Sequence, residues 1–196
     1  MSSKESVYRM IGASNHTEEE RQSEDYYATD PIAIDALLKG GASIDHNVYE
    51  PFCGEGHLSK RLEEHGFNVK STDLIDRGFG EGGINFFDQT EMFDGDIVTN
   101  PPYSEAKRAV EHALELIPEG HKVFMFLKLT FLEGKARRKL FDKKCLKTVW
   151  VSTSRINCAK NGDFEKLKIS GGTALAQAWF EFEKGYYGDP VIKWIN

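Results

Sequence analysis

Residues 47–56 read Asn-Val-Tyr-Glu-Pro-Phe-Cys-Gly-Glu-Gly, and this stretch decides the fold. Its first four residues predict a short strand, and its two glycines form a turn into a helix that starts at His57 and is closed by Gly66. Residues 67–73, Phe-Asn-Val-Lys-Ser-Thr-Asp, predict a second strand that ends in an acid. A strand, a glycine turn, a helix and a second strand form one βαβ unit, so the sequence predicts a parallel sheet.

Strands and helices continue to alternate on both sides of this unit. Apolar runs without polar interruption indicate buried strands, and apolar residues repeating every three or four positions indicate helices. We expect strands at 96–99, 122–127, 147–152 and 173–184, and a last short strand after the turn at 186–190. We expect helices between Asp30-Pro31 and Gly40-Gly41, at 105–117 and at 132–141. A short strand or turn is expected at 84–87 and a polar loop at 157–172.

Length and composition predict one globular domain. The chain has 196 residues, of which 40% are hydrophobic, which is enough for a single core. We interpret residues 1–24 as a polar, loosely held arm and residues 25–196 as one domain without a separate target-recognition domain. Neither a signal peptide nor a membrane span is expected. Three widely spaced cysteines favour a reduced, cytoplasmic setting, and no metal site is expected, since only Cys53 and His57 have ligand-like spacing.

Charge is unevenly distributed along the chain. The net charge is −6, yet residues 121–170 contain 13 Lys and Arg against 4 Asp and Glu, which gives this segment +9. Its densest part lies at 135–144 and includes Arg137, Arg138 and Lys139. Two interpretations stay open for this cluster: a solvated helix face, or a surface that contacts the phosphates of nucleic acid.

The glycine turn at 50–56 is placed where a doubly wound sheet binds a nucleotide-like ligand. Gly54 and Gly56 are present, but the third glycine of a pyrophosphate-binding turn would fall at Ser59. A dinucleotide is therefore disfavoured, whereas S-adenosylmethionine carries no phosphate and needs only close backbone approach. Asp73, at the end of the second strand, is placed to accept hydrogen bonds from two ribose hydroxyls.

A second motif, Asn100-Pro101-Pro102-Tyr103, follows the predicted strand at 96–99. Asn100 offers a side-chain oxygen and Pro101 a backbone carbonyl, which together can accept both hydrogens of a planar amine. The aromatic ring of Tyr103 can stack on the base that carries this amine once the base has left a duplex. An ordinary turn that closes a strand is the alternative interpretation.

Together these motifs resemble the amino-methyltransferases that modify N6 of adenine in DNA, especially the small phage and prophage type. The resemblance covers roughly residues 25–196 and rests on Glu50-Pro-Phe-Cys-Gly-Glu-Gly56, Asp73 and Asn100-Pro-Pro-Tyr103 in that order. It implies an α/β, Rossmann-like class I methyltransferase fold, with a seven-stranded, mostly parallel sheet, helices on both faces and an antiparallel last strand. It further implies S-adenosylmethionine as cofactor, DNA as partner, and transfer of a methyl group to adenine.

The resemblance also assigns residues to three kinds of site. The catalytic residues would be Asn100, Pro101, Pro102 and Tyr103. The cofactor would be bound by Tyr27, Thr29, Glu50, Pro51, Phe52, Gly54, Gly56, Asp73, Asn85, Phe86 and Asn100. The substrate would be bound by Tyr103, Phe131, Trp179, Arg137, Arg138 and Lys139.

The chain departs from the family pattern at two points. Where the family has an acid before Phe to bind the cofactor's adenine amino group, the sequence has Asn85-Phe86, so either Asn85 or Asp88 would take this role. Without a recognition domain, target selection falls to loops such as 157–172, and we expect a short or relaxed target. RNA adenine or a protein glutamine as the methyl acceptor, and a silent nucleic-acid-binding module, are the alternative functions.

Overall fold

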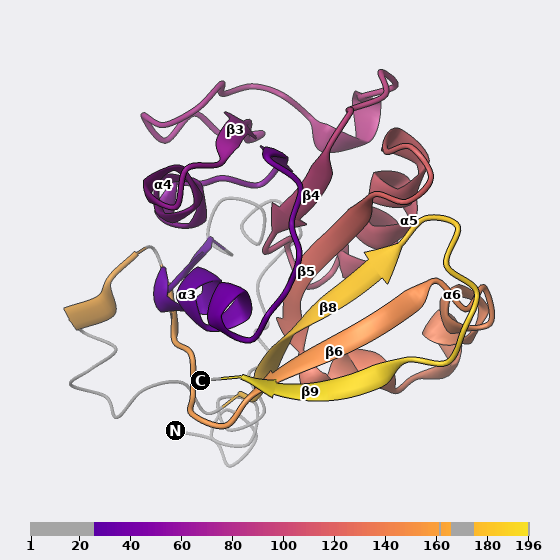
Figure 1. Cartoon of the computed structure of the whole chain (residues 1–196). Helices are drawn as coiled ribbons and strands as arrows, with labels where there is room; N and C mark the ends of the chain where they lie inside the picture. The colour runs from indigo at the N-terminus through magenta and orange to yellow at the C-terminus, as the bar shows by residue number, and fades with distance from the viewer. Residues whose placement is uncertain (1–25, 161, 166–174, 196) are drawn as a thin grey trace, which may run out of the picture.

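A seven-stranded sheet forms the centre of the protein. The computed structural model describes residues 26–160, 162–165 and 175–195. The strand order is β3-β2-β4-β5-β8-β6-β9, and neighbouring strands are parallel except where β8 pairs with β5 and β6 (Figure 1). The predicted seven-stranded, mostly parallel sheet is thus confirmed. Its strands are β2 (Asn47–Glu50), β3 (Asn68–Ser71), β4 (Asp96–Thr99), β5 (Lys122–Lys128), β6 (Leu146–Ser152), β8 (Gln177–Glu183) and β9 (Val191–Ile195).

The antiparallel strand is the aromatic strand β8, but it is not the last strand. β9 follows it and pairs parallel to β6, at the edge of the sheet. Because the connection 184–190 passes the start of β6, β9 pairs with the outer side of β6. In a hairpin, β9 would instead pair with β8. Residues 173 and 174 of the predicted aromatic strand lie outside the described residues.

Helices cover both faces of the sheet. On one face, α3 (Ile32–Lys39) and α4 (His57–Glu64) enclose a core with the fully buried Phe124 and Trp179. On the other face, α5 (Ala106–Leu116) packs a row of small apolar residues against strands β4, β5 and β8 (Figure 1). The alternation of buried side chains along the strands therefore supplies two cores, one on each side of the sheet.

The predicted helix at 132–141 is wrong in extent. The segment forms three short pieces, η2 (Leu129–Leu132), η3 (Lys135–Arg137) and α6 (Arg138–Phe141). Gly134 has a φ of 108°, and this non-helical conformation separates η2 from η3. Only Leu140 is buried in α6, because the basic residues around it leave no apolar stripe to hold a longer helix.

Two further segments were predicted as a strand or turn and as a loop. The stretch at 84–87 takes the turn alternative and leads into a 3-10 helix, η1 (Phe86–Asp88), which is capped by Asn85. The predicted loop at 157–172 begins with a strand, β7 (Cys158–Lys160), which pairs antiparallel with β1 (Tyr27–Thr29) in a small second sheet. Residues 161 and 166–172 of that loop lie outside the described residues, as does the arm at 1–24.

Among the described residues, no helix is long and apolar enough to cross a membrane.

Candidate functional site

A pocket of about 500 Å³ opens at the carboxyl ends of the central strands. Its volume lies within the range of roughly 300–1,000 Å³ that is usual for small-molecule sites. Its walls come from β1, the glycine turn, the loop after β3, η1 and the segment after β4. The predicted residues that line it are Tyr27, Thr29, Glu50, Pro51, Phe52, Asp73, Asn85, Phe86, Asn100, Pro101, Pro102 and Tyr103.

The ring of Tyr26 packs over the glycine turn. Gly54 and Gly56 have φ values of 55° and 79°, and a Cβ atom on Gly54 would lie 2.1 Å from the ring of Tyr26. The hydroxyl of Tyr26 in turn accepts a hydrogen bond from the amide of Glu55 at 3.0 Å. Glycine is therefore required at position 54 both by backbone conformation and by the close approach of this ring.

Asp73 joins the glycine turn to the pocket. One carboxylate oxygen accepts a hydrogen bond from the amide of Gly54 at 2.8 Å, and the other accepts one from the amide of Ile75 at 2.9 Å. These two bonds fix the orientation of the carboxylate. Each oxygen has a second lone pair, so both can accept another hydrogen bond from a ligand in the pocket that Asp73 lines.

Asn85, and not Asp88, reaches this pocket. Asn85 lines it, and its side-chain oxygen accepts from the amide of Phe87 at 3.1 Å. Its amide nitrogen donates to Asp88 at 3.0 Å, so Asp88 holds Asn85 from outside. Phe86, which is buried, and Phe52 lie edge to face with ring centroids 5.2 Å apart and form an apolar wall next to Asn85.

Asn100 is held by its amide nitrogen alone. That nitrogen donates to the hydroxyl of Thr29 at 2.8 Å and to the carbonyl of Tyr27 at 3.3 Å. Because a carbonyl can only accept, these contacts decide which end of the amide is nitrogen. The oxygen of Asn100 is buried and has no hydrogen-bond partner among the described residues. The turn that follows is closed by the amide of Glu105 donating to the Pro102 carbonyl at 3.0 Å, so it makes no use of the Pro101 carbonyl.

Tyr103 is fixed by two neighbouring strands. The amide nitrogen of Gln177 on β8 donates to its hydroxyl at 2.6 Å, and the ammonium of Lys128 on β5 lies 4.1 Å from its ring centroid. The ring of Tyr27 lies 6.0 Å away. Burial raises the pKa of Tyr103 far above its usual range, so the phenol stays neutral.

Glu50 is a buried acid beneath the glycine turn. Ser59 on α4 donates a short hydrogen bond to its carboxyl group, and the hydroxyls of Ser59 and Ser71 lie 2.7 Å apart. Burial raises the pKa of Glu50 to about 8. The position where a third glycine would fall is thus occupied by a serine that partners this acid, so the turn departs from the Gly-x-Gly-x-x-Gly pattern of pyrophosphate-binding turns.

The raised pKa of Glu50 predicts a pH dependence of stability. Between pH 4.5 and about pH 8 the folded protein keeps the proton that the unfolded chain releases, so the free energy of unfolding should fall as pH rises through this window. Glu50→Gln should remove this decline, which is on the order of a few kcal/mol. Denaturant unfolding at several pH values measures it, with Glu115→Gln on the exposed side of α5 as the matched control. Equal slopes for wild type and Glu50→Gln would contradict the assignment.

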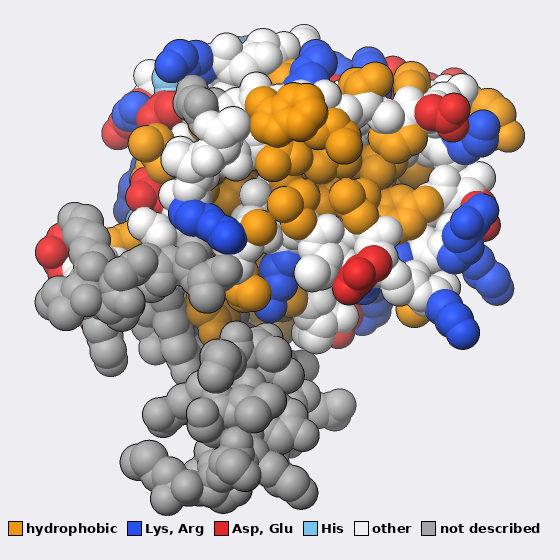
Figure 2. Space-filling view, turned by 90° about the horizontal axis from the view of Figure 1, so that it is seen from below, with side chains coloured by type: hydrophobic (Ala, Val, Ile, Leu, Met, Phe, Trp, Pro, Cys, Tyr) orange, Lys and Arg blue, Asp and Glu red, His pale blue; other side chains and the backbone are white. Residues whose placement is uncertain are grey.

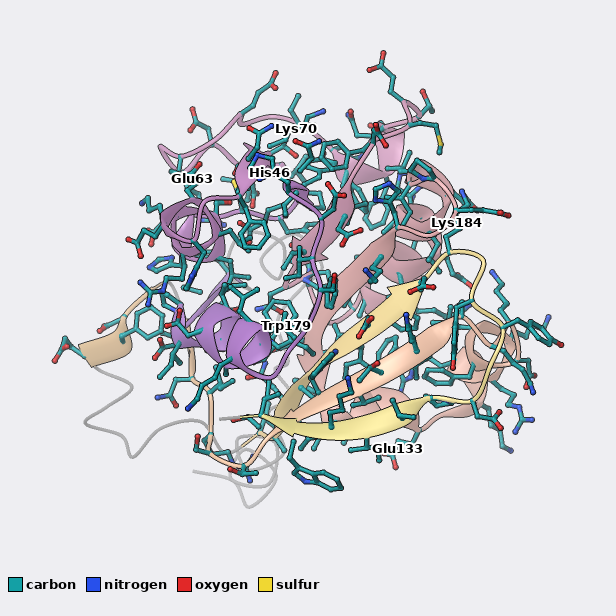
Figure 3. All side chains as sticks on the ribbon, viewed as in Figure 1. His46, Glu63, Lys70, Glu133, Trp179 and Lys184 are labelled. Carbon is teal, nitrogen blue, oxygen red and sulfur yellow. The ribbon has the colours of Figure 1, made fainter. Side chains whose placement is uncertain are left out.

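Several predicted substrate residues lie outside this pocket. Phe131 packs its ring against Phe180 at 5.5 Å and belongs to the core. Trp179 is fully buried and donates its indole N–H to the Ala33 carbonyl at 2.9 Å, pointing from β8 toward α3 (Figure 3). Neither ring has a surface available for a base. Both side chains lie in the core, where large apolar and aromatic residues are often found.

The three basic residues of the predicted phosphate cluster differ from one another. Arg137 donates to the backbone carbonyls of Thr130 and Glu133, so it holds its own loop together. Arg138 is exposed and pairs with Asp142 at 2.7 Å. Lys139 is exposed as well. Only the last two therefore present their charges to solvent.

Four residues near the pocket are absent from the predicted site residues. Tyr26 and Arg77 line it, and the guanidinium of Arg77 stacks 4.5 Å from the Tyr26 ring. The Nε atom of Arg77 is buried and has no partner among the described residues. Lys128 and Gln177 reach Tyr103 from paired positions on β5 and β8. Their roles depend on strand register, which a single sequence does not reveal.

The described part of the chain contains no group of three or more His, Cys, Asp or Glu side chains that could hold a metal ion. Burial raises the pKa of the Cys53 thiol to about 12, so the thiol is protonated at neutral pH. His57 instead contacts the hydroxyl of Tyr26 at 3.2 Å.

No protein-family model and no curated protein sequence matches the chain. Solved structures do match. A protein assigned as an RNA methyltransferase from Pyrococcus horikoshii aligns with a TM-score of 0.52 and 15% identity over 78% of this chain and 81% of its own. A predicted O-methyltransferase from Agrobacterium tumefaciens gives 0.56 and 10% over 84% and 85%. A modification subunit assigned to a type I restriction enzyme of Vibrio vulnificus gives 0.57 and 11% over 94% and 49%.

These likenesses, together with the sheet order and the helices on both faces, show that the chain has the Rossmann-like fold of class I methyltransferases.

Proposed function

We propose that the protein transfers a methyl group from S-adenosylmethionine to the N6 amino group of adenine in DNA. The observation that carries this proposal is the buried, unpartnered side-chain oxygen of Asn100 at the wall of the pocket. A buried acceptor without a partner costs free energy on the order of 1–3 kcal/mol. A ligand amine that donates to this oxygen recovers that cost.

The amine of adenine suits the acceptors that surround it. One of its hydrogens is directed to the Asn100 oxygen and the other to the Pro101 carbonyl. Two such bonds draw the nitrogen toward tetrahedral geometry, so that its lone pair leaves conjugation with the ring. The acceptors become more effective as positive charge develops on the nitrogen, so they act chiefly in the transition state. No strong base is needed before attack, because the proton leaves after the new bond has formed.

The pocket residues fit S-adenosylmethionine as the methyl donor. Asp73 retains acceptor capacity for two ribose hydroxyls, and Phe52 and Phe86 form an apolar wall for an adenine ring. Arg77 offers an Nε–H, without a partner among the described residues, for the carboxylate of the methionine part. When bound, this cofactor supplies an electrophilic methyl group on a sulfonium. The protein's residues supply in-line positioning of the amine and exclusion of water.

Two observations support nucleic acid as the substrate. The ring of Tyr103 is rigidly held at the pocket, as stacking on a flipped base requires. Among the similar structures, one carries the name of an RNA methyltransferase and another that of a restriction-enzyme modification subunit. We favour DNA because the motifs resemble those of adenine amino-methyltransferases of DNA.

The test is a parallel transfer assay with the purified full chain and methyl-labelled S-adenosylmethionine. Single- and double-stranded DNA, RNA of the same sequence and a protein extract serve as acceptors. Label recovered as N6-methyladenine from DNA is the expected result. Label in RNA or in protein glutamine, with none in DNA, would show that one of these alternative substrates accepts the methyl group. DNA binding without any methyl transfer would indicate a silent module.

Arg138 and Lys139 are expected to contact DNA phosphates. Replacing both with Gln should weaken DNA binding and reduce the slope of log affinity against log salt by about 1.8, because each phosphate contact contributes roughly 0.9. The slope is measured by titration at several salt concentrations, with Lys39→Gln on α3 as a control for lost surface charge. Arg137 is left unchanged because it holds its loop. A slope equal to that of the wild type would identify the cluster as a solvated surface.

A further inference from the structure

The side chain of Asn85 is fixed by two contacts of opposite polarity. Its oxygen accepts a hydrogen bond from the amide of Phe87 at 3.1 Å, and its nitrogen donates to a carboxylate oxygen of Asp88 at 3.0 Å. A backbone N–H can only donate, and a carboxylate can only accept. The two contacts therefore define which end of the side-chain amide is oxygen, and turning this amide over would break both hydrogen bonds.

The two contacts lie on different sides of the pocket wall. Phe87 lines the pocket together with Asn85, whereas Asp88 is exposed and does not line it. The oxygen of Asn85 is therefore held on the pocket side and the nitrogen on the solvent side. This oxygen keeps a second lone pair for a ligand. Next to it, the rings of Phe52 and Phe86 supply the apolar wall against which a flat base can pack.

Asp88 strengthens the orientation that the capping bond begins. Hydrogen bonds to an ionised acceptor are stronger than those between neutral groups. Asp88 is the last residue of η1, the helix that Asn85 caps, so the support is reciprocal: the amide caps the helix, and the helix presents the carboxylate that orients the amide. Without this carboxylate, only the backbone amide of Phe87 would orient Asn85.

We propose that Asp88 is a positioning residue that restricts this part of the pocket to a purine base with a 6-amino group. The inference rests on the proposed function, in which S-adenosylmethionine occupies the pocket. With the Asn85 oxygen directed inward, the amine of the cofactor's adenine meets an acceptor. A 6-oxo base would instead bring its own carbonyl oxygen against that acceptor, and neither oxygen could donate. The reversed amide would suit a 6-oxo base, and Asp88 opposes this reversal.

Calorimetric titration of the full chain with S-adenosylhomocysteine and with its 6-oxo analogue, S-inosylhomocysteine, tests the proposal without any methyl transfer. The wild type should bind the amino form about 10-fold or more tightly, because the oxo form leaves acceptors unpaired. Asp88→Asn should reduce this ratio about 3- to 10-fold, because an amide at position 88 can donate as well as accept and so permits both orientations of Asn85. The ratio compares two ligands on one protein, so partial unfolding of a variant does not change it.

Three results would contradict the proposal, and they differ from one another. Equal affinities of the wild type for the two ligands would show that this part of the pocket does not select the base. An unchanged ratio in Asp88→Asn would show that the carboxylate does not position Asn85. Binding of neither ligand to the wild type would overturn the proposed cofactor together with this inference.

Exchanging the two side chains separates positioning from a purely structural role of Asp88. In the double variant Asn85→Asp, Asp88→Asn, the carboxylate at position 85 has only acceptors, and the amide at position 88 can donate to it. The preference for the amino form should return to at least the wild-type ratio. A double variant that keeps the reduced ratio of Asp88→Asn would overturn the proposal.

The matched control is Asp189→Asn, which also replaces a surface carboxylate by an amide. Its side chain is 92% exposed. Asp189 directly precedes Pro190 and β9, the strand at the edge of the sheet opposite β3, and Figure 2 is seen from the side of this edge. The ratio of the two affinities should therefore equal that of the wild type.

Discussion

Asn100→Ala is expected to lower the rate of methyl transfer by about 100-fold or more, a scale typical of a deleted transition-state hydrogen bond. The variant removes the unpartnered oxygen to which we assign the amine, while the apolar and ribose-binding walls of the pocket stay in place. Cofactor affinity should therefore change little. Single-turnover assays on adenine-containing DNA, with calorimetry for the cofactor, separate the two quantities.

The matched control for this experiment is Asn68→Ala, the same substitution at an exposed position on β3. It should leave transfer at the wild-type rate. Asn100 also ties the segment after β4 to β1 through Thr29 and Tyr27, so thermal unfolding of the variant is measured as well. A near-normal rate of methyl transfer by a folded Asn100→Ala protein would contradict the proposed mechanism.

Asp73→Ala is expected to weaken S-adenosylmethionine binding by about 1.5–3 kcal/mol, which corresponds to roughly 10- to 150-fold. The loss has two physical sources. The ribose hydroxyls lose charged acceptors, and the amide of Gly54 loses the carboxylate that it binds at 2.8 Å. Asp73→Asn keeps one acceptor oxygen without the charge, so its affinity should lie between those of wild type and the alanine variant.

Calorimetric titration of the cofactor measures this effect, and Asp94→Ala, whose side chain is 93% exposed, is the control. An alanine variant that binds the cofactor with unchanged affinity would remove Asp73 from the site. Reduced affinity together with unchanged DNA binding would place Asp73 on the cofactor side of the pocket, separate from Tyr103.

The parallel sheet and the place of the pocket could be predicted from the amino-acid sequence. The glycine turn between residues 50 and 56 forces a strand-to-helix turn, and the parallel strands that follow must end at the same edge of the sheet. For this reason Asp73 and Asn100, 27 residues apart, were predictable as neighbours of one pocket. These signals are local: each depends on residues close together in the chain, and sheet topology brings them together.

Which aromatic and basic residues lie near the pocket depends on contacts in the folded protein. Trp179 and Phe131 resemble base-binding residues in sequence, yet both side chains pack into the core, Trp179 from β8 and Phe131 from η2. Arg137 resembles a phosphate contact, yet its guanidinium binds backbone carbonyls of its own loop. Register between β5 and β8 brings Lys128 and Gln177 to Tyr103, and register between β6 and β9 leaves Trp194 exposed. These outcomes rest on contacts between residues far apart in the chain, for which a single sequence carries no periodic signal.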